Sequence, residues 1–394
     1  MSLERELQLE LETLERNGLL RRLTQIDERR GPRVRVEGCE LLLLCGNDYL
    51  GLAGDPRLAQ AAAHAAREHG TGSGSSRLIS GDCELLRRLE RAAAELVELP
   101  EALAFGSGYQ ANVGLLGALA GPEDALLSDE LNHASIIDGA RLSAARKLIY
   151  PHLDLDALER GLIEARTARR RIVVSETLFS MDGDSPDLSR LAELCQRHDA
   201  WLVLDEAHAL GVLGPHGAGL AAEHGVSGRV AALVGTLGKA FGSSGAFVAG
   251  SRVLREFLIN RCRSLIFSTA PSPTTAAAAT MGIEIALGMD AQRAALLRSA
   301  DELRHRLREY GFDAPSGQSP IVPLLLGDPA AALRGQRLLW DQGVWVQAIR
   351  PPTVPQGTSR LRISLRADLC PADLELAARA FAQLAAQSVE RVGG

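Results

Sequence analysis

Lysine is almost absent from this chain, and one of its two lysines, Lys239, lies in the stretch VGTLGKAFGSSG. The other is Lys147, and the rest of the 43 Lys+Arg residues are arginine. Arginine keeps its proton inside a protein, whereas a desolvated lysine can lose its proton and act as a nucleophile or a base. Lys239 is therefore a candidate reactive amine, although a chance survivor in an arginine-rich chain would look the same.

Short apolar segments alternate with helical patterns before and around this lysine. They are EALAF, DALLS, KLIY, RIVVS, WLVLD, AALVG and GAFVAG. Each is brief, rich in leucine or β-branched residues and not alternating in polarity, which is typical of strands buried on both faces of a parallel sheet. The sequence therefore predicts an α/β fold with a mostly parallel central sheet.

Polar or glycine residues follow five of these segments. In chain order they are Gly108 and Tyr109, His133, Glu176 and Ser180, Asp205 and His208, and Thr236 and Lys239. Ligands of open α/β sheets bind beyond the carboxyl ends of the strands. We therefore expect these residues to form one site.

A lysine, a carboxylate, a ring partner and a phosphate-binding turn together fit pyridoxal 5'-phosphate (PLP). This cofactor withdraws electrons only while its ring nitrogen stays protonated, and a carboxylate such as Asp205 favours that proton. His208 is placed to hydrogen-bond the ring oxygen. The helix N-terminus at Gly108 and Tyr109 offers backbone N–H groups to a phosphate, and the Thr236 hydroxyl adds a donor. We expect no metal ion at the site.

Plain structural roles compete with these interpretations. Asp205 and His133 would each serve as helix N-caps, and Ser180 and Asn47 would each serve a turn. His208 would be an ordinary buried histidine. These alternatives stay open at the level of sequence.

Two motifs point elsewhere and are rejected. Residues 205–208 spell the DEAH tetrapeptide of helicases, but that function needs an upstream G-x-x-x-x-G-K-[ST] loop, and the only candidate, around Lys239, lies downstream without the hydroxyl residue. GTGSGS at 70–75 resembles a dinucleotide-binding fingerprint, but it follows a helical pattern and has the wrong glycine spacing. We interpret it as a loop.

Composition limits the partners and the compartment. The net charge of −6 argues against binding to nucleic acid. Six cysteines without a Cys-x-x-Cys pair are typical of reduced thiols. The N-terminus is too charged for a signal peptide, and no apolar run approaches membrane-spanning length. We expect a cytoplasmic protein that does not bind membranes.

Three parts of the chain are expected. Residues 1–50 hold a helix with leucines at 3, 7, 11 and 14 and a short hairpin-like strand segment. Residues 51–285 form the large cofactor-binding α/β domain. Residues 286–394, with IVPLLLG, VWVQAI and RLRISL, form a smaller α+β domain.

Six motifs make the family recognisable. They are GNDYLGL, GSGSSRLISG, SETLFSMDGD, LVLDEAHALG, TLGKAFG and AIRPPTVPQGTSRLRISL. Along nearly its whole length the chain resembles the α-oxoamine synthases, PLP enzymes of fold type I. The last motif most resembles the branch of biotin biosynthesis. Ala209 and Leu210 depart from the small residue and Ser or Thr usual after the histidine, which puts the details of that loop in doubt.

The resemblance implies a role for each matched residue around the cofactor. Lys239 carries PLP covalently and then acts as the base on the substrate. Asp205 pairs with the ring nitrogen, His208 binds the ring oxygen, and His133 stacks on the ring and assists proton transfer. The other cofactor contacts implied or expected are Gly108, Tyr109, Glu176, Ser180 and Thr236.

The substrate contacts are implied in the same way. Arg362 binds the amino-acid carboxylate as a bidentate fork, Arg21 and Thr353 contact the acyl substrate, and Asn47 belongs to the substrate site. Two alternatives stay open, because Arg22 adjoins Arg21, and because Arg360, Arg362 and Ser364 share a strand face that could be solvated.

The implied activity is the decarboxylative condensation of L-alanine with pimeloyl-CoA or pimeloyl-acyl carrier protein, in a homodimer whose sites lie between subunits. A sibling enzyme of the glycine C-acetyltransferase type, using another amino acid or thioester, keeps every catalytic residue. A non-enzymatic regulator with this fold would need a DNA-binding extension, and the residues before GNDYLGL show only one clear helix.

Overall fold

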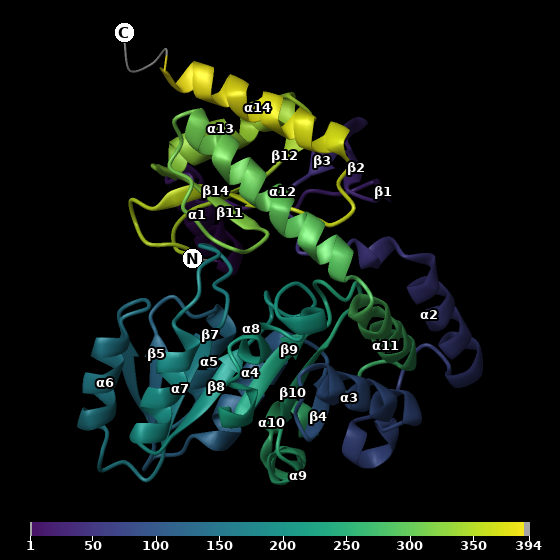
Figure 1. The fold of residues 1–394 in the computed structure, drawn as a ribbon, viewed down its shortest axis with the longest axis vertical. Coiled ribbons are helices and arrows are strands. Elements are labelled where there is room, and N and C mark those ends of the chain that lie inside the picture. Colours follow the sequence, from purple (N-terminus) through teal and green to yellow (C-terminus); the bar gives the residue numbers. More distant parts are fainter. Residues whose placement is uncertain (1, 390–394) are drawn as a thin grey trace. The chain divides into compact units, whose positions relative to one another are not determined.

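The computed structural model describes residues 2–389 and divides the chain into two compact units (Figure 1). One unit comprises residues 47–180 and 184–294. The other comprises the residues up to 46, residues 181–183 and the residues from 295 on. The N-terminal segment thus groups with C-terminal residues, and the expected domain limits at 50 and 285 stay predictions.

A seven-stranded sheet organises the larger unit, with the strand order β4-β10-β9-β8-β7-β5-β6. Its strands are β4 (Glu101–Phe105), β5 (Ala125–Asp129), β6 (Arg146–Tyr150), β7 (Arg171–Glu176), β8 (Ala200–Asp205), β9 (Ala232–Thr236) and β10 (Ala246–Gly250). The expected α/β fold with a mostly parallel sheet is confirmed. GAFVAG differs, because β10 runs antiparallel to both of its neighbours, β4 and β9.

Both faces of this sheet are buried, as the unbroken apolar segments predict. Leu126, Val174 and Val203 join one apolar cluster with residues of α4, α5 and α9. The alternate residues Leu127, Val173 and Leu204, which point to the other face by strand geometry, are also buried. A sheet covered on both faces leaves its carboxyl-end loops as the natural place for a ligand.

Helices connect these strands, and many begin at a side-chain cap. They are α2 (Pro56–His69), α3 (Glu84–Leu96), α4 (Gly108–Leu119), α5 (Ala134–Leu142), α6 (Leu155–Glu164), α7 (Leu188–Arg197), α8 (Leu220–Glu223), α9 (Arg252–Arg261), α10 (Arg263–Ile266) and α11 (Pro273–Leu287). Ser107, for example, caps α4 by accepting a hydrogen bond from the Gln110 backbone N–H at 3.1 Å. This cap fixes where α4 starts, directly after β4.

The smaller unit contains two sheets. One has the order β1-β2-β3-β12, with β1 (Glu28–Arg30), β2 (Arg33–Val36), β3 (Cys39–Leu43) and β12 (Val344–Trp345). The other has the order β11-β14-β13, with β11 (Ile321–Gly327), β13 (Gln347–Ile349) and β14 (Ser359–Ser364). Its helices are α1 (Leu3–Arg16), α13 (Pro329–Asp341), α14 (Pro371–Val389) and most of α12 (Asp290–Glu309).

Helix α1 forms where the leucine spacing predicts, but its leucine stripe is not buried in the single chain. Leu3, Leu7, Leu11 and Leu14 are each at least 41% exposed. The periodicity therefore predicted the helix and its apolar face but not what covers that face.

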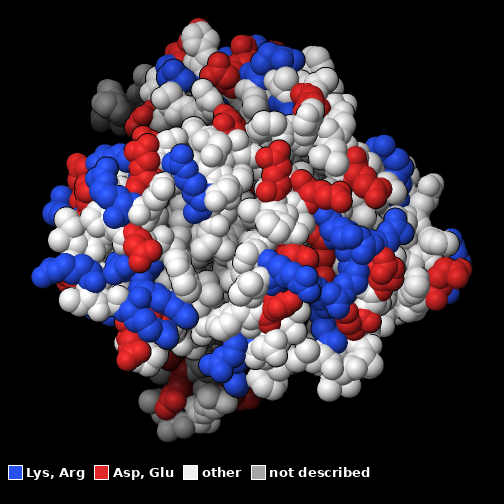
Figure 2. Space-filling view, turned by 60° about the horizontal axis from the view of Figure 1, so that its bottom comes forward, with Lys and Arg blue, Asp and Glu red and all other residues white. Residues whose placement is uncertain are grey.

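Charges of both signs are mixed on one face of the molecule (Figure 2). Figure 2 shows Lys and Arg interleaved with Asp and Glu on the face that it displays, rather than one sign gathered into a stripe. Among residues 2–389 no helix is long and apolar enough to cross a membrane. In the same part of the chain no group of His, Cys, Asp and Glu is arranged to hold a metal ion.

Helix α4 leads into the site, and its glycines offer a matched test of the packing. A Cβ at Gly114 would collide with Ser264 Oγ and Cys262 Sγ, and Ser264 is held by a 2.8 Å hydrogen bond to the Gln110 carbonyl. Gly114→Ala should lower the free energy of unfolding by about 1–3 kcal/mol through overpacking. Denaturant titration of the purified protein measures this loss.

Gly117 is the control, one helical turn further along α4. Apart from its chain neighbours and the backbone of its own helix, no described heavy atom lies within 4 Å of a Cβ built there. Gly117→Ala should raise the free energy of unfolding by about 0.5–1 kcal/mol, since alanine orders at a lower entropic cost in a helix. Equal effects of the two substitutions would contradict this packing of α4.

Candidate active site

Lys239 lies in the loop after β9, and its amine contacts a histidine. Lys239 Nζ is 2.7 Å from His208 Nε2, and the other ring nitrogen of His208, Nδ1, is 2.7 Å from the Tyr49 hydroxyl. His208 and Tyr49 are both buried. Lys239, His208 and Tyr49 thus form a hydrogen-bonded chain that positions the amine. His208 itself lies three residues after the end of β8.

Asp205 is buried at the end of β8, and its carboxylate is oriented by two donors. Asn112 Nδ2 donates to Oδ2 at 2.7 Å, and the Ala207 backbone N–H donates to Oδ1 at 2.9 Å. The Asn112 amide also donates to Ser135 Oγ at 3.0 Å. No helix starts directly after Asp205, since residues 206–214 form a loop of turns and bends, so its alternative role as a helix N-cap is wrong.

His133 lies beyond the end of β5 and does cap the helix that follows it. Its Nδ1 accepts a hydrogen bond from the Ser135 backbone N–H at 3.2 Å and lies 2.8 Å from Ser135 Oγ. The capping alternative is therefore confirmed, and it holds the ring in a fixed orientation. Burial lowers the pKa of His133, with Asp205 opposing the shift and the Lys239 amine adding to it. The neutral ring is favoured.

Glu176 ends β7, next to this histidine. Its Oε1 accepts a hydrogen bond from the His133 backbone N–H at 2.6 Å, and its side chain is buried. Burial raises the pKa of Glu176 to about 8, and repulsion from the Asp205 carboxylate adds to the shift. Ends of three neighbouring parallel strands thus bring His133, Glu176 and Asp205 into electrostatic range of one another and of the Lys239 amine.

The raised pKa of Glu176 predicts a pH dependence of stability in the cofactor-free protein. A carboxyl whose pKa is higher in the folded state stabilises fully below its unfolded value of 4.5, and this contribution is lost as the pH rises through about 8. Between about pH 4.5 and pH 8, the free energy of unfolding of the wild-type protein should therefore fall by up to about 1.4 kcal/mol per pH unit, the limit for one proton. Glu176→Gln should remove that loss.

Urea titrations at pH 6, 7, 8 and 9 measure how the free energy of unfolding changes with pH. Glu193→Gln, on the exposed surface of α7, is the control and should follow the wild-type pH profile. Parallel profiles for wild type and Glu176→Gln would show that this carboxyl is already ionised at pH 6.

The expected phosphate contacts lie at two loops. Gly108 begins α4, and no described heavy atom lies within 4 Å of a Cβ built there, so the helix N-terminus is open to a ligand. Tyr109 beside it is 48% exposed and donates to Asp138. Thr236 Oγ1 instead donates within its own turn, to the Gly245 carbonyl at 3.2 Å.

Ser180 lies in the loop after β7 and is half-buried. That loop is closed by a 2.9 Å hydrogen bond from the Phe179 N–H to the Asp184 carbonyl. Asn47 accepts a 3.3 Å hydrogen bond from the Tyr49 hydroxyl through Oδ1, which connects it to the His208 chain. Both residues thus sit in structured turns, as their alternative roles suggest, without being excluded from the site.

The remaining predicted substrate residues belong to the smaller unit. Arg21 Nη2 donates to Thr353 Oγ1 at 3.1 Å, so two expected acyl contacts are neighbours. Both line a cavity of ≈ 410 Å³ that also contains Arg22 and Arg350. Its lining includes no Asp or Glu among the described residues. The cavity is therefore suited to an anionic ligand with an apolar body.

Arg362 is on β14, the central strand of its three-stranded sheet. It is 5% exposed, and its Nη1 donates to Ser364 Oγ at 2.8 Å, as two residues on one strand face should. Arg360 is 4% exposed and pairs with Asp182. The alternative of a solvated strand face is therefore wrong.

Three contributors to the site were not predicted: Tyr49, Asn112 and Ser135. Tyr49 lies within the motif GNDYLGL, Asn112 follows the predicted residues Gly108 and Tyr109, and Ser135 follows His133 by two residues. Asn112 is one helical turn after Gly108, a spacing that places it on the same side of α4. That spacing was the available signal for a second partner of Asp205.

Together these residues fit a group with an aldehyde, a basic ring nitrogen and a phosphate. A lysine amine, a buried carboxylate with oriented oxygens and a helix N-terminus follow the carboxyl ends of β9, β8 and β4, three strands of one sheet. The buried Asp205 carboxylate accepts hydrogen bonds from neutral donors only, the Asn112 amide and the Ala207 backbone N–H, among its described contacts, which suits a cationic ring nitrogen.

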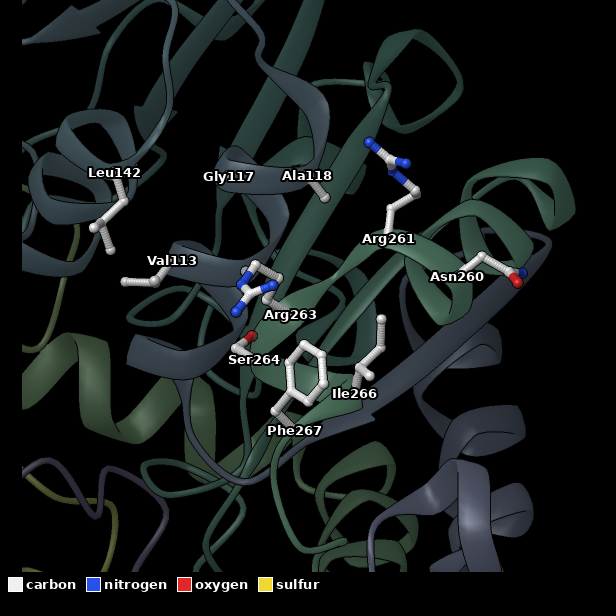
Figure 3. A pocket seen from close by; sticks show the side chains of 11 residues that line it. Val113, Gly117, Ala118, Leu142, Asn260, Arg261, Arg263, Ser264, Ile266 and Phe267 are labelled. Carbon is white, nitrogen blue, oxygen red and sulfur yellow. The ribbon is translucent and has the colours of Figure 1, made fainter.

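Another cavity, of ≈ 650 Å³, belongs to the larger unit and lies between α4 and the 260–267 segment (Figure 3). Apolar side chains at its rim are open to solvent, with Leu142 72% and Phe267 70% exposed. Arg263 lies over the Phe267 ring at 4.8 Å. None of the predicted site residues lines this cavity.

The chain matches the family model of class I and II aminotransferases over residues 40–381. It is 50% identical over 358 residues to an 8-amino-7-oxononanoate synthase of Anaeromyxobacter dehalogenans, covering 91% of this chain and 90% of that protein. It is 46% identical over 377 residues to the synthase of Geobacter sulfurreducens, covering 95% and 96%.

Three solved structures are similar to this chain over most of its length. A serine palmitoyltransferase from S. paucimobilis with bound PLP and myriocin is 28% identical, with a TM-score of 0.93 and coverage of 99% and 100%. The serine palmitoyltransferase of Sphingomonas wittichii is 31% identical, with a TM-score of 0.91 and coverage of 96% for both chains. An 8-amino-7-oxononanoate synthase of Francisella tularensis is 26% identical, with a TM-score of 0.76 and coverage of 89% and 99%.

Proposed function

The chain belongs to the class I and II aminotransferase family, and we propose that it condenses L-alanine with a pimeloyl thioester to give 8-amino-7-oxononanoate, CO₂ and a free thiol. The observation that carries this proposal is the 45–51% identity, over at least nine-tenths of the chain, to proteins named 8-amino-7-oxononanoate synthase. The reaction is a PLP-dependent acyl transfer of biotin biosynthesis.

PLP is the cofactor, and Lys239 is the residue proposed to hold it covalently. Asp205 is proposed for the ring nitrogen, His208 for the ring oxygen and His133 for the ring face. Gly108, Tyr109, Ser180 and Thr236 are proposed for the ring substituents and phosphate, with Glu176 supporting His133. When bound, PLP supplies an electron-withdrawing ring that stabilises negative charge on the amino-acid carbon.

Lys239 is the proposed base. Once its amine is released and neutral, it takes the proton from the α-carbon of alanine, a step to which a positioned base contributes about 10²–10⁴-fold. The Lys239 amine lies 2.7 Å from His208 Nε2, so the proposed base is adjacent to the residue proposed for the ring oxygen. Arginine at this position would stay protonated and take no proton.

Asp205 and His133 prepare the same site electrostatically. The two hydrogen bonds to Asp205 fix its carboxylate, so that its charge is directed without reorganisation during the reaction. The lowered pKa of His133 keeps its ring neutral near pH 7, which suits stacking and later proton transfer.

The substrate groups are assigned to arginines. We propose Arg362 for the alanine carboxylate, since a guanidinium binds a carboxylate through two parallel hydrogen bonds. Arg21 and Thr353 are proposed for the acyl substrate, and Asn47 for the substrate site. The cavity of ≈ 410 Å³ with arginine side chains supports an acyl chain that ends in a carboxylate.

The alternative function is that of a related α-oxoamine synthase that uses another amino acid or acyl thioester, and the structural comparisons favour testing it. The TM-scores to serine palmitoyltransferases, 0.91–0.93, exceed the 0.76 to the Francisella synthase. Release of thiol from pimeloyl-CoA, pimeloyl-acyl carrier protein, acetyl-CoA and palmitoyl-CoA, each with alanine, glycine or serine, separates the two. We expect turnover with alanine and a pimeloyl thioester; turnover with only glycine or serine would assign the sibling activity.

The proposal includes a homodimer in the cytoplasm. The exposed apolar side chains around the cavity in Figure 3, Leu142 and Phe267 among them, support a second copy as the covering partner. The scattered cysteines favour a reducing compartment. Sedimentation of the purified protein is expected to give twice the mass of 42.0 kDa, and a concentration-independent monomer would contradict this part.

A further inference from the structure

His152, which the function does not use, lies between two aspartates. Its Nδ1 is 2.9 Å from Asp129 Oδ1, and its Nε2 is 3.1 Å from Asp184 Oδ2. The ring packs edge-on against Phe179 at 4.5 Å between centroids. A histidine with a carboxylate on each nitrogen holds two protons and acts as a cation with two fixed directions.

These contacts join the loops after three neighbouring strands. Asp129 ends β5 and also accepts hydrogen bonds from the backbone N–H groups of Leu131 and Leu153, both at 2.9 Å. The His152 backbone N–H donates to Glu130 at 2.9 Å. Asp184 belongs to the loop after β7, whose closing hydrogen bond with Phe179 was described above. The histidine therefore links the loop leading to His133 with the loop carrying Ser180.

The charge of the histidine is stable in this surrounding. Burial alone would lower the pKa of His152, but the hydrogen bonds with Asp129 and Asp184 raise it to about 10. The charged or titratable groups facing it are Asp129, Glu130 and Asp184. Its side chain is 18% exposed and that of Asp129 is 1% exposed, so solvent screens this ion pair weakly, whereas the Asp184 side chain is 38% exposed.

The other histidine–carboxylate pairs in the described chain each involve a single carboxylate. His198 contacts one carboxylate, Glu159, at 3.4 Å, and it lies before β8 rather than after a strand. His216 and His305 are more than two-thirds exposed and contact one carboxylate each. Within the described residues, the double pairing at carboxyl strand ends is thus particular to His152.

We propose that His152 is a positioning residue, whose imidazolium sets the separation of the loops that carry His133 and Ser180 and thereby the fit of the cofactor. This rests on the proposed function, since His133 and Ser180 matter here as contacts of PLP. The described partners of His152 are Asp129, Glu130, Phe179 and Asp184, so it acts on the site through these residues and is not a catalytic residue.

The test compares His152→Gln with His198→Gln in the full-length protein. PLP is titrated into each apoprotein and followed by absorbance, and the free energy of unfolding of each apoprotein is measured in urea. His152→Gln should raise the Kd for PLP roughly 10-fold or more, since hydrogen bonds to charged groups are worth about one tenfold step or more. His198→Gln should leave that Kd within about 2-fold.

The charge-retaining variant His152→Lys gives a second readout. It should recover part of the lost PLP affinity, which a purely volumetric role of the ring would not predict. If His152→Gln and His198→Gln change the Kd equally, or His152→Gln leaves it unchanged while the wild type binds PLP, the positioning role is wrong and the proposed function stands.

A measurement without cofactor distinguishes a failure of the His152 proposal from a failure of the proposed function. In NMR spectra of the wild-type apoprotein, the His152 ring signals should keep imidazolium shifts from pH 6 to 9. Titration of this ring near pH 6.5 would contradict the double pairing. If the wild type does not bind PLP at all but His152 stays charged, the linkage exists and the proposed function fails.

Discussion

Replacing Lys239 by arginine is expected to lower kcat for thiol release by at least about 10²–10⁴-fold, the contribution of a positioned general base. Arginine preserves the positive charge and most of the side-chain length, but it keeps its proton and forms no covalent link with an aldehyde. The wild-type amine lies 2.7 Å from His208 Nε2, a contact that the larger guanidinium cannot reproduce with the same geometry. The variant should also lose the absorbance of the bound cofactor.

Lys147→Arg is the matched control, because it is the same substitution at the chain's other lysine. Lys147 is exposed on β6, away from the carboxyl ends of the strands. Its kcat should stay within about 2-fold of wild type, as is usual for surface substitutions. Equal activities of the two variants would remove the chemical role of Lys239.

The second large effect is expected at Asp205. Asp205→Asn should lower kcat by about 10²–10³-fold, as removal of a preorganised electrostatic partner of the transition state does. The asparagine keeps the shape and one acceptor for the Asn112 or Ala207 donor, but it lacks the charge that keeps a ring nitrogen protonated. Steady-state kinetics with alanine and a pimeloyl thioester measures the change.

Asp199→Asn removes a carboxylate just before the same strand and serves as control. Its side chain is 98% exposed, so the loss of its pair with Arg171 should leave kcat unchanged. An Asp205→Asn enzyme with a kcat near wild type would show that Asp205 supports the site only through its hydrogen bonds.

The sequence predicted the strands and the residues at their ends because both depend on local information. Buried parallel strands are recognisable as unbroken apolar segments, and the chain leaves each of them at the ligand-binding edge. Lys239, Asp205 and His133 could therefore be assigned to one edge without knowing the strand order. The order and direction of β10 did not follow from its composition.

The direction of β10 had a signal in the length of its connection. Residues 237–245 join β9 to β10, fewer than the dozen or more that a parallel crossover needs. The tight loop therefore forces an antiparallel pair and places Lys239 in a turn between the two strands. Counting the connection would have corrected the prediction.

Burial was harder to predict than position. The alternation of RLRISL placed Arg362 and Ser364 on one face, but only the pairing of β14 with β11 and β13 on its two sides makes that strand central and buried. Tyr49 was missed for a related reason, because its contact reaches His208 across a long sequence separation. Asn112 also contacts Asp205 over a long separation, and only its spacing from Gly108 along α4 gave a local signal.

Reduction of the PLP-loaded protein with borohydride, followed by digestion and mass mapping, tests the central claim most directly. The account predicts that the cofactor's mass is found on the peptide that contains Lys239, in wild-type protein and in Lys147→Arg, and is absent from Lys239→Arg. Cofactor attached to Lys147, to the N-terminal amine or to no peptide would contradict it.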